Sequence, residues 1–83
     1  MHFRAEIKVE LKKSVNDPQG TTVLSALHAL GFEGAFGARI GKFITIDLDS
    51  KDRASALTDI DQMCQKLLAN PVIESYEISI TNS

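Results

Sequence analysis

The sequence predicts an α+β domain in which an antiparallel or mixed sheet carries two helices on one face, as two β-α-β halves related to the ferredoxin-like pattern. Alternation of apolar and polar residues marks strands in three places, with one break near Glu74 in the last, and apolar residues at helical spacing mark a helix in each gap between them. With 83 residues, 43% of them hydrophobic, residues 1–83 suit one small domain with a thin core.

The first strand is the clearest element of the sequence. The segment FRAEIKVEL alternates over residues 3–11 without an error. Its two faces divide into apolar residues (Phe3, Ala5, Ile7, Val9 and Leu11) and charged residues (Arg4, Glu6, Lys8 and Glu10). This pattern predicts a strand that has one face on the core and the other in water.

The next segment begins with Asp17-Pro18-Gln19-Gly20, which has too few glycines and no following lysine for a phosphate-binding P-loop. Asp17 instead suits a helix N-cap, and Pro18 suits the first helical position. Apolar residues then recur at helical spacing (Val23, Leu24, Leu27 and Leu30), and Gly31 suits a left-handed helix end. The sequence therefore predicts a helix after Asp17, whose N-terminus would also favour an anion.

Residues 36–48 form the third element, with apolar residues at even positions (Phe36, Ala38, Ile40, Ile44, Ile46 and Leu48). The unbroken alternation favours one long strand that bends at Gly41, where no Cβ hinders a bend. The alternative is a hairpin with Gly41-Lys42 as its two-residue loop, which would place Arg39 opposite Ile44 on the apolar face. Both alternatives put Arg39 and Lys42 in the middle of an extended region.

The second helix is predicted within residues 50–70, where Ser50 or Asp52 can cap it and Asn70 can end it. Its apolar stripe consists of Ala56, Leu57, Ile60, Met63, Cys64 and Leu67. The segment VIESYEISI, residues 72–80, closes the fold as a strand.

Composition argues against several functional classes. A net charge of −2 disfavours general nucleic-acid binding, and no apolar run approaches the roughly 20 residues of a membrane span. The single cysteine, Cys64, cannot form an internal disulfide, which fits a cytoplasmic protein, and its apolar stripe predicts an inert buried thiol. Two separate histidines and scattered carboxylates predict neither a metal site nor a catalytic residue.

Arg39 and Lys42 are the charged residues that the pattern explains least. Lys42 falls on the apolar side of the alternation, where a buried ammonium group is costly. Either the bend turns this position to water, or both cations meet a carboxylate of a partner chain or an anionic ligand. Neither alternative makes them catalytic residues.

Three segments, VNDPQGTTVLSALHALGF, ARIGKFITIDLD and MCQKLLANPVIESYEI, occur in this order and together resemble the PurS family. PurS proteins are the small subunits of phosphoribosylformylglycinamidine (FGAM) synthase, and the likeness covers essentially the whole chain. The segment FEGAFGA departs from the family pattern, because it is richer in glycine and alanine.

The resemblance implies a role in de novo purine synthesis, where the complete enzyme makes FGAM from formylglycinamide ribonucleotide, ATP and glutamine. In that enzyme PurQ carries the glutaminase cysteine, and PurL binds the substrate and ATP with Mg²⁺. PurS bridges them as a homodimer or higher oligomer, supports ammonia transfer, and needs no catalytic residue, cofactor or metal of its own. The resemblance also makes Arg39 and Lys42 candidate contacts to a partner or an anion, and it implies that Asp17 and Gln19 occupy an exposed position at the assembly surface.

Other functions fit parts of the sequence. A small-ligand-binding regulatory module of the ACT type has a similar element order and dimerises, and residues 14–20 could form its ligand-binding turn. An RNA-binding sheet of the RRM type needs several exposed aromatic residues, whereas the predicted outer face offers Phe43 alone. Open strand edges in so small a sheet independently predict at least a dimer.

Overall fold

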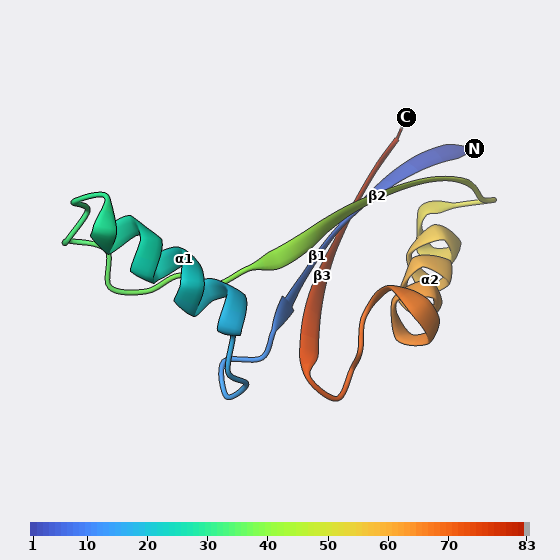
Figure 1. The fold of residues 1–83 in the computed structure, drawn as a ribbon. Coiled ribbons are helices and arrows are strands. Elements are labelled where there is room, and N and C mark those ends of the chain that lie inside the picture. The colour runs from blue at the N-terminus through green and yellow to red at the C-terminus, as the bar shows by residue number, and fades with distance from the viewer. Residues whose placement is uncertain (83) are drawn as a thin grey trace.

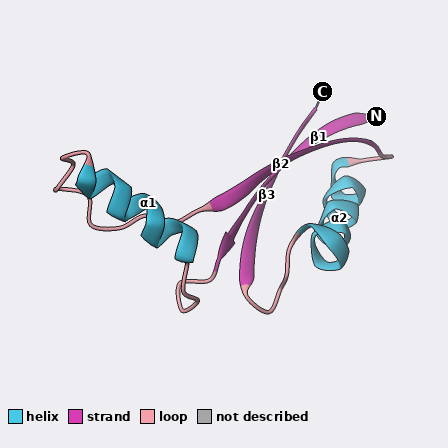
Figure 2. Cartoon of the chain, viewed as in Figure 1, coloured by secondary structure: helices cyan, strands magenta, loops and turns pink. Residues whose placement is uncertain are grey.

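The computed structural model describes residues 1–82 as a three-stranded antiparallel sheet with two helices (Figure 1, Figure 2). The elements follow in the chain as β1 (His2–Leu11), α1 (Pro18–Ala29), β2 (Gly41–Asp49), α2 (Arg53–Met63), the π-helical turn η1 (Cys64–Leu68) and β3 (Glu74–Asn82). The α+β class and the predicted order of strands and helices are confirmed. No helix of residues 1–82 is long and apolar enough to cross a membrane.

The central strand is β1, which lies between β2 and β3 and is antiparallel to both. Its residue Ile7 lies opposite Ile44 on one side and Ile78 on the other. The odd-numbered residues of β1 are buried from Phe3 to Val9, and the even-numbered residues are exposed. We call the face of the odd-numbered residues the inner face. Its alternation with the charged outer face was predicted correctly from the sequence.

The inner face is covered by α2, which packs mainly against β1 and β3. The buried part of the helical stripe consists of Ala56, Ile60 and Cys64. Leu57, at the margin of the stripe, is exposed, and Leu67 is 82% exposed while Leu68 packs on the core. The prediction for Leu67 is wrong because the wider π-helical turn accommodates one extra residue and shifts the stripe by one position.

The first helix does not cover the sheet, so the prediction of two helices on one face is wrong for this chain. Figure 1 shows α1 projecting from one end of the strands, whereas α2 runs alongside them. The molecule is correspondingly elongated, with extents of 51 × 27 × 14 Å. We call residues 18–37, which include α1, the arm. The arm projects because the two segments that connect it to the sheet are tied to each other, as described below.

The second strand of the chain, β2, lies at one edge of the sheet and begins at Gly41, which pairs with Glu10 near the end of β1. Gly41 and Lys42 are therefore the first residues of a strand that pairs with β1, and the alternative of a hairpin with these two residues as its loop is wrong. The prediction of one long bent strand is wrong for its first half, because residues 36–40 pair with no strand of the described chain. Its second half is confirmed, since the apolar side chains of β2 (Ile44, Ile46 and Leu48) pack on the core together.

Candidate functional site

The arm joins the sheet at a shallow groove of about 260 Å³. Its lining consists of Val9, Glu10, Leu11, Asp17, Gln19, Ile40, Gly41, Lys42 and Glu74. Three of the four predicted contact residues, Asp17, Gln19 and Lys42, thus lie together, and Arg39 adjoins the groove through its neighbour Ile40. That these residues contact a partner or an anion stays a prediction.

Asp17 lies at the centre of this junction and is only 5% exposed, so the expectation that it occupies an exposed position is wrong, because its carboxylate is turned inward to backbone N–H groups. Its carboxylate accepts the backbone N–H of Ile40 at 2.8 Å and that of Gly20 at 2.9 Å. These hydrogen bonds, first that from Ile40 and then that from Gly20, hold the pKa of the Asp17 carboxyl below its usual range. The predicted N-cap is confirmed. The sequence did not reveal that the same side chain also holds the segment that leads into β2.

Arg39 also joins the two segments that connect the arm to the sheet. Its Nη2 donates to the carbonyl oxygens of Lys12 at 2.9 Å, Val15 at 3.2 Å and Leu11 at 3.3 Å. Two of these carbonyls lie in the loop between β1 and α1 and the third ends β1, so the guanidinium joins the chain entering the arm to the chain leaving it. Its side chain is also exposed to solvent, where a carboxylate of a partner can reach it.

Lys42 is exposed although its position belongs to the inner face by alternation. The reason is that β2 begins only one residue earlier, at the end of the sheet. Its Nζ donates to the carbonyl oxygen of Leu68 at 3.3 Å, at the C-terminal end of η1, where helical carbonyls favour a cation. The side chain is thus exposed without the bend expected at Gly41, and whether it faces water or a partner stays open. Gln19 is exposed in the first turn of α1.

Gly20 allows the backbone of α1 to approach the segment before β2. A Cβ at this position would lie 2.2 Å from the carbonyl oxygen of Ala38 and 3.0 Å from a carboxylate oxygen of Asp17. Real side chains do not approach a backbone oxygen so closely, so only glycine fits without a shift of the chain. The residues that fix the arm on the sheet, which we call the arm junction, are Asp17, Gly20, Arg39 and Ile40.

The arm exposes apolar side chains that a folded chain normally covers. Leu30 is 73% exposed and Phe36 is 98% exposed, and Val23 and Phe32 are exposed as well. On the sheet, the inner side chains of β2 are only half-buried, because α2 packs mainly over β1 and β3. Within the described chain, an apolar helix and an apolar strip of sheet are thus left incompletely covered.

Among residues 1–82, no three His, Cys, Asp or Glu side chains lie close enough together to hold a metal ion. The thiol of Cys64 is buried, and burial raises its pKa, which disfavours the reactive thiolate.

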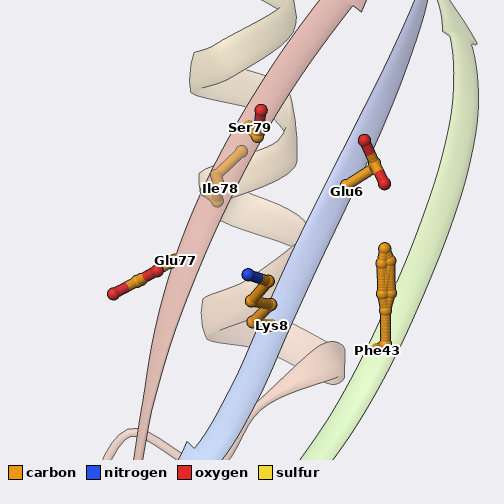
Figure 3. A pocket seen from close by; sticks show the side chains of 6 residues that line it. All are labelled: Glu6, Lys8, Phe43, Glu77, Ile78 and Ser79. Carbon is orange, nitrogen blue, oxygen red and sulfur yellow. The ribbon is translucent and has the colours of Figure 1, made fainter.

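The outer face of the sheet carries a shallow pocket lined mainly by charged and polar side chains (Figure 3). Phe43 lies there as its aromatic residue and is 54% exposed. One aromatic ring does not make the base-stacking surface that an RNA-binding sheet requires.

Comparison with known proteins assigns the chain to a family. Residues 4–82 match the family described as PurS: phosphoribosylformylglycinamidine (FGAM) synthase. The chain belongs to the PurS family. The PurS subunit of phosphoribosylformylglycinamidine synthase from Synechocystis is 47% identical over 79 residues, which cover 95% of this chain and 79% of the relative. The PurS subunit from Archaeoglobus fulgidus is 43% identical and covers 89% of this chain and 92% of its own length.

Solved structures agree with this assignment and with the fold. PurS from Methanocaldococcus jannaschii has a TM-score of 0.87 at 36% identity, covering 98% of both chains. A chain in the structure of PurLQS from Thermotoga maritima has a TM-score of 0.90 at 28% identity, covering 98% of this chain and 99% of its own length. The resemblance predicted from three short segments is therefore confirmed, and the chain belongs to a family of subunits of a purine-biosynthetic ligase.

Proposed function

We propose that this chain is the non-catalytic assembly subunit of a cytoplasmic FGAM synthase, in which it bridges PurL and PurQ. PurL then uses ATP with Mg²⁺, PurQ releases ammonia from glutamine, and this chain binds neither cofactor. The curated relatives bear the name of FGAM synthase subunits, and a similar chain comes from the PurLQS structure, which supports the proposal. Two further observations on residues 1–82 agree with the proposal, namely that no cluster of side chains could hold a metal ion and that the Cys64 thiol is buried.

The projecting arm is the observation that carries this proposal. Its helix of 12 residues is about 18 Å long, and the nine residues of β2 span about 30 Å. The arm of one copy can therefore lie along the half-buried inner side chains of β2 in a second copy. Reciprocal exchange of arms would cover both apolar surfaces and give a two-fold symmetric dimer.

The arm junction prepares the arm for this association. Asp17 and Arg39 hold the connections of the arm by hydrogen bonds, so its direction is set before a second copy binds. A surface that is ordered in advance loses less conformational entropy on binding, and its affinity is higher. A fixed arm thus suits a subunit whose function is to hold other subunits in place.

Ammonia transfer between PurQ and PurL needs a closed path rather than a reactive group in this chain. A path that keeps ammonia from water and protons is best lined by small and apolar side chains. The assembled apolar surfaces of the arm and β2 could form part of the lining of this path, and the buried thiol of Cys64 need not take part.

Reconstitution tests this function. PurL and PurQ from the same organism should form FGAM from glutamine only when this chain is added. With ammonium chloride as nitrogen donor, PurL should form FGAM at the same rate with or without the chain, because transfer between sites is bypassed. Glutamine-dependent synthesis that is unaffected by omission of the chain would contradict the proposal.

A further inference from the structure

The outer face of the sheet takes no part in the function proposed above. Every strand residue that points to this face is exposed, because α2 packs on the inner face. Figure 3 shows the outer side chains of Glu6, Lys8 and Phe43, which help to line a hollow of about 240 Å³. Phe43 is 54% exposed, so an aromatic ring lies uncovered among charged side chains.

The charges on the outer face of β1 alternate in sign along the strand (Arg4, Glu6, Lys8 and Glu10). On the two neighbouring strands, Glu6 and Glu10 have only uncharged residues directly across from them (Thr45, Ser79, Gly41 and Ser75). These two glutamates therefore lack a cross-strand cation within the described chain, and a surface that supplies one can pair with them.

The two cations of β1 have carboxylates of their own chain across from them. Arg4 donates to Asp47 through Nε at 2.9 Å and through Nη2 at 3.4 Å, and Lys8 lies directly opposite Glu77. The guanidinium keeps further donors on Nη1, and an ammonium group has three donors. Both cations can thus bind a second carboxylate without losing the first.

We propose that the outer face binds the outer face of a second copy, with antiparallel strands and a two-fold axis that crosses β1 over Ile7. This axis places Glu6 of each copy opposite Lys8 of the other, and Arg4 opposite Glu10, so all four charges of β1 meet the opposite sign. A two-fold axis along β1 would instead place each charge opposite its own copy. The alternating pattern is therefore its own complement in the antiparallel arrangement.

The other residues of these rows are compatible with the same axis. It places β2 opposite β2 and β3 opposite β3, so no two carboxylates face each other directly. The facing residues follow from the strand register (Phe43 with Thr45, Asp47 with Gly41, Glu77 with Ser79, and Ser75 with Thr81). The exposed ring of Phe43 is thereby covered in both copies.

The spacing of packed sheets suits this contact. Two sheets lie about 10 Å apart and cross at about 30°, which leaves room for facing Lys and Glu side chains and keeps the rows nearest the axis in closest contact. Charged residues at the ends of the sheet diverge and contribute little (His2, Asp49, Lys12 and Glu74). Because the arm of a second copy would lie on the inner face, both interfaces can exist together, and the outer face joins arm-exchanged dimers.

Exchanging charges within one chain tests this interface. Glu6→Lys and Lys8→Glu each bring like charges together across the axis, whereas Glu6→Lys/Lys8→Glu restores opposite charges. Sedimentation velocity at low salt measures association beyond the dimer. Each single variant should weaken this step by about tenfold, since each changes two symmetry-related contacts, and the double variant should return it to within about twofold of the wild type. Added salt should weaken the step in the wild type.

Two controls separate this interface from general effects of charge and from the arm. Asp59→Lys makes the same change of charge as Glu6→Lys on the exposed side of α2, and it should leave association unchanged. Leu30→Ser should weaken the arm-exchanged dimer instead. All the substituted side chains are exposed, so the variants should melt within a few degrees of the wild type.

The inference is overturned if the wild type forms nothing larger than a dimer, or if the double variant associates no better than the single variants. An equal effect of Asp59→Lys would overturn it as well. If Glu6→Lys weakens binding to PurL or PurQ and leaves self-association unchanged, a different subunit occupies the face and the second copy is ruled out. The reconstitution described above is independent, because its failure would contradict the proposed function and leave this interface standing.

Discussion

Replacing Gly20 with alanine should destabilise the arm junction, although the same change usually stabilises a helix. Alanine is favoured over glycine by about 1 kcal/mol inside a helix. At Gly20, however, the new Cβ would lie 2.2 Å from the carbonyl oxygen of Ala38, and contacts below 3.0 Å do not persist. The oxygen belongs to the backbone and cannot rotate away, so the segment before β2 has to move by about 1 Å, and overpacking of this kind costs about 1–3 kcal/mol.

The two effects leave a net loss of roughly 0–2 kcal/mol at the junction. Because the shift also disturbs the bond between Ile40 and Asp17, the arm loses its fixed direction, and self-association should weaken by up to roughly 30-fold. Sedimentation equilibrium and thermal melting measure both effects. Gly34→Ala and Gly37→Ala are the controls, since a Cβ at either position meets nothing within 4 Å. A Gly20→Ala chain that is more stable and self-associates normally would refute the reasoning.

Three further predictions concern the junction and the core. Asp17→Asn keeps an acceptor for the N-cap but places an amide NH₂ against the N–H of Ile40, so it should weaken self-association in sedimentation assays. The control is Asp52→Asn, at a cap that binds Ser55 alone, which should leave self-association unchanged. Folding lowers the pKa of the Asp17 carboxyl. The ionised carboxylate therefore contributes its full stabilisation above the ordinary carboxyl pKa of about 3.9, and this stabilisation is lost as the pH falls through the lowered pKa of the folded state. The difference in unfolding free energy between wild type and Asp17→Asn should therefore shrink below about pH 4 in urea titrations, and a constant difference would contradict the role of the carboxylate. Ile60→Ala removes a fully buried side chain between α2 and the sheet and should cost about 2–5 kcal/mol in chemical unfolding, and a loss below 1 kcal/mol would show that the core is not where we place it.

Local signals in the sequence were sufficient for most individual elements. The alternation of β1 predicted a strand with one buried face, since its period depends only on neighbouring residues. Asp17 and Pro18 predicted the start of α1, and Gly31 has the left-handed conformation, with φ of 98°, expected at its end. Each of these features is decided within a few residues of chain.

Features that depend on distant residues were not predicted. Arg39 donates to carbonyls 24 to 28 residues earlier, so its place in the arm junction could not be read from its neighbours. The helical period gave Leu67 as buried, because it assumes a constant turn and η1 has a wider one. The prediction that α1 covers its own sheet assumed that a chain buries its own apolar surface. An arm that projects away from its own sheet breaks that assumption.

The account depends most on the claim that this chain acts by holding other subunits together rather than by chemistry of its own. The direct measurement is glutamine-dependent FGAM formation by fixed amounts of PurL and PurQ, titrated with the wild-type chain and with Leu30→Ser. We predict that the rate rises and saturates at a fixed ratio of subunits, that more Leu30→Ser is needed to reach the same rate, and that the chain alone is inactive. Turnover by the chain alone, or a rate that does not depend on its concentration, would contradict the account.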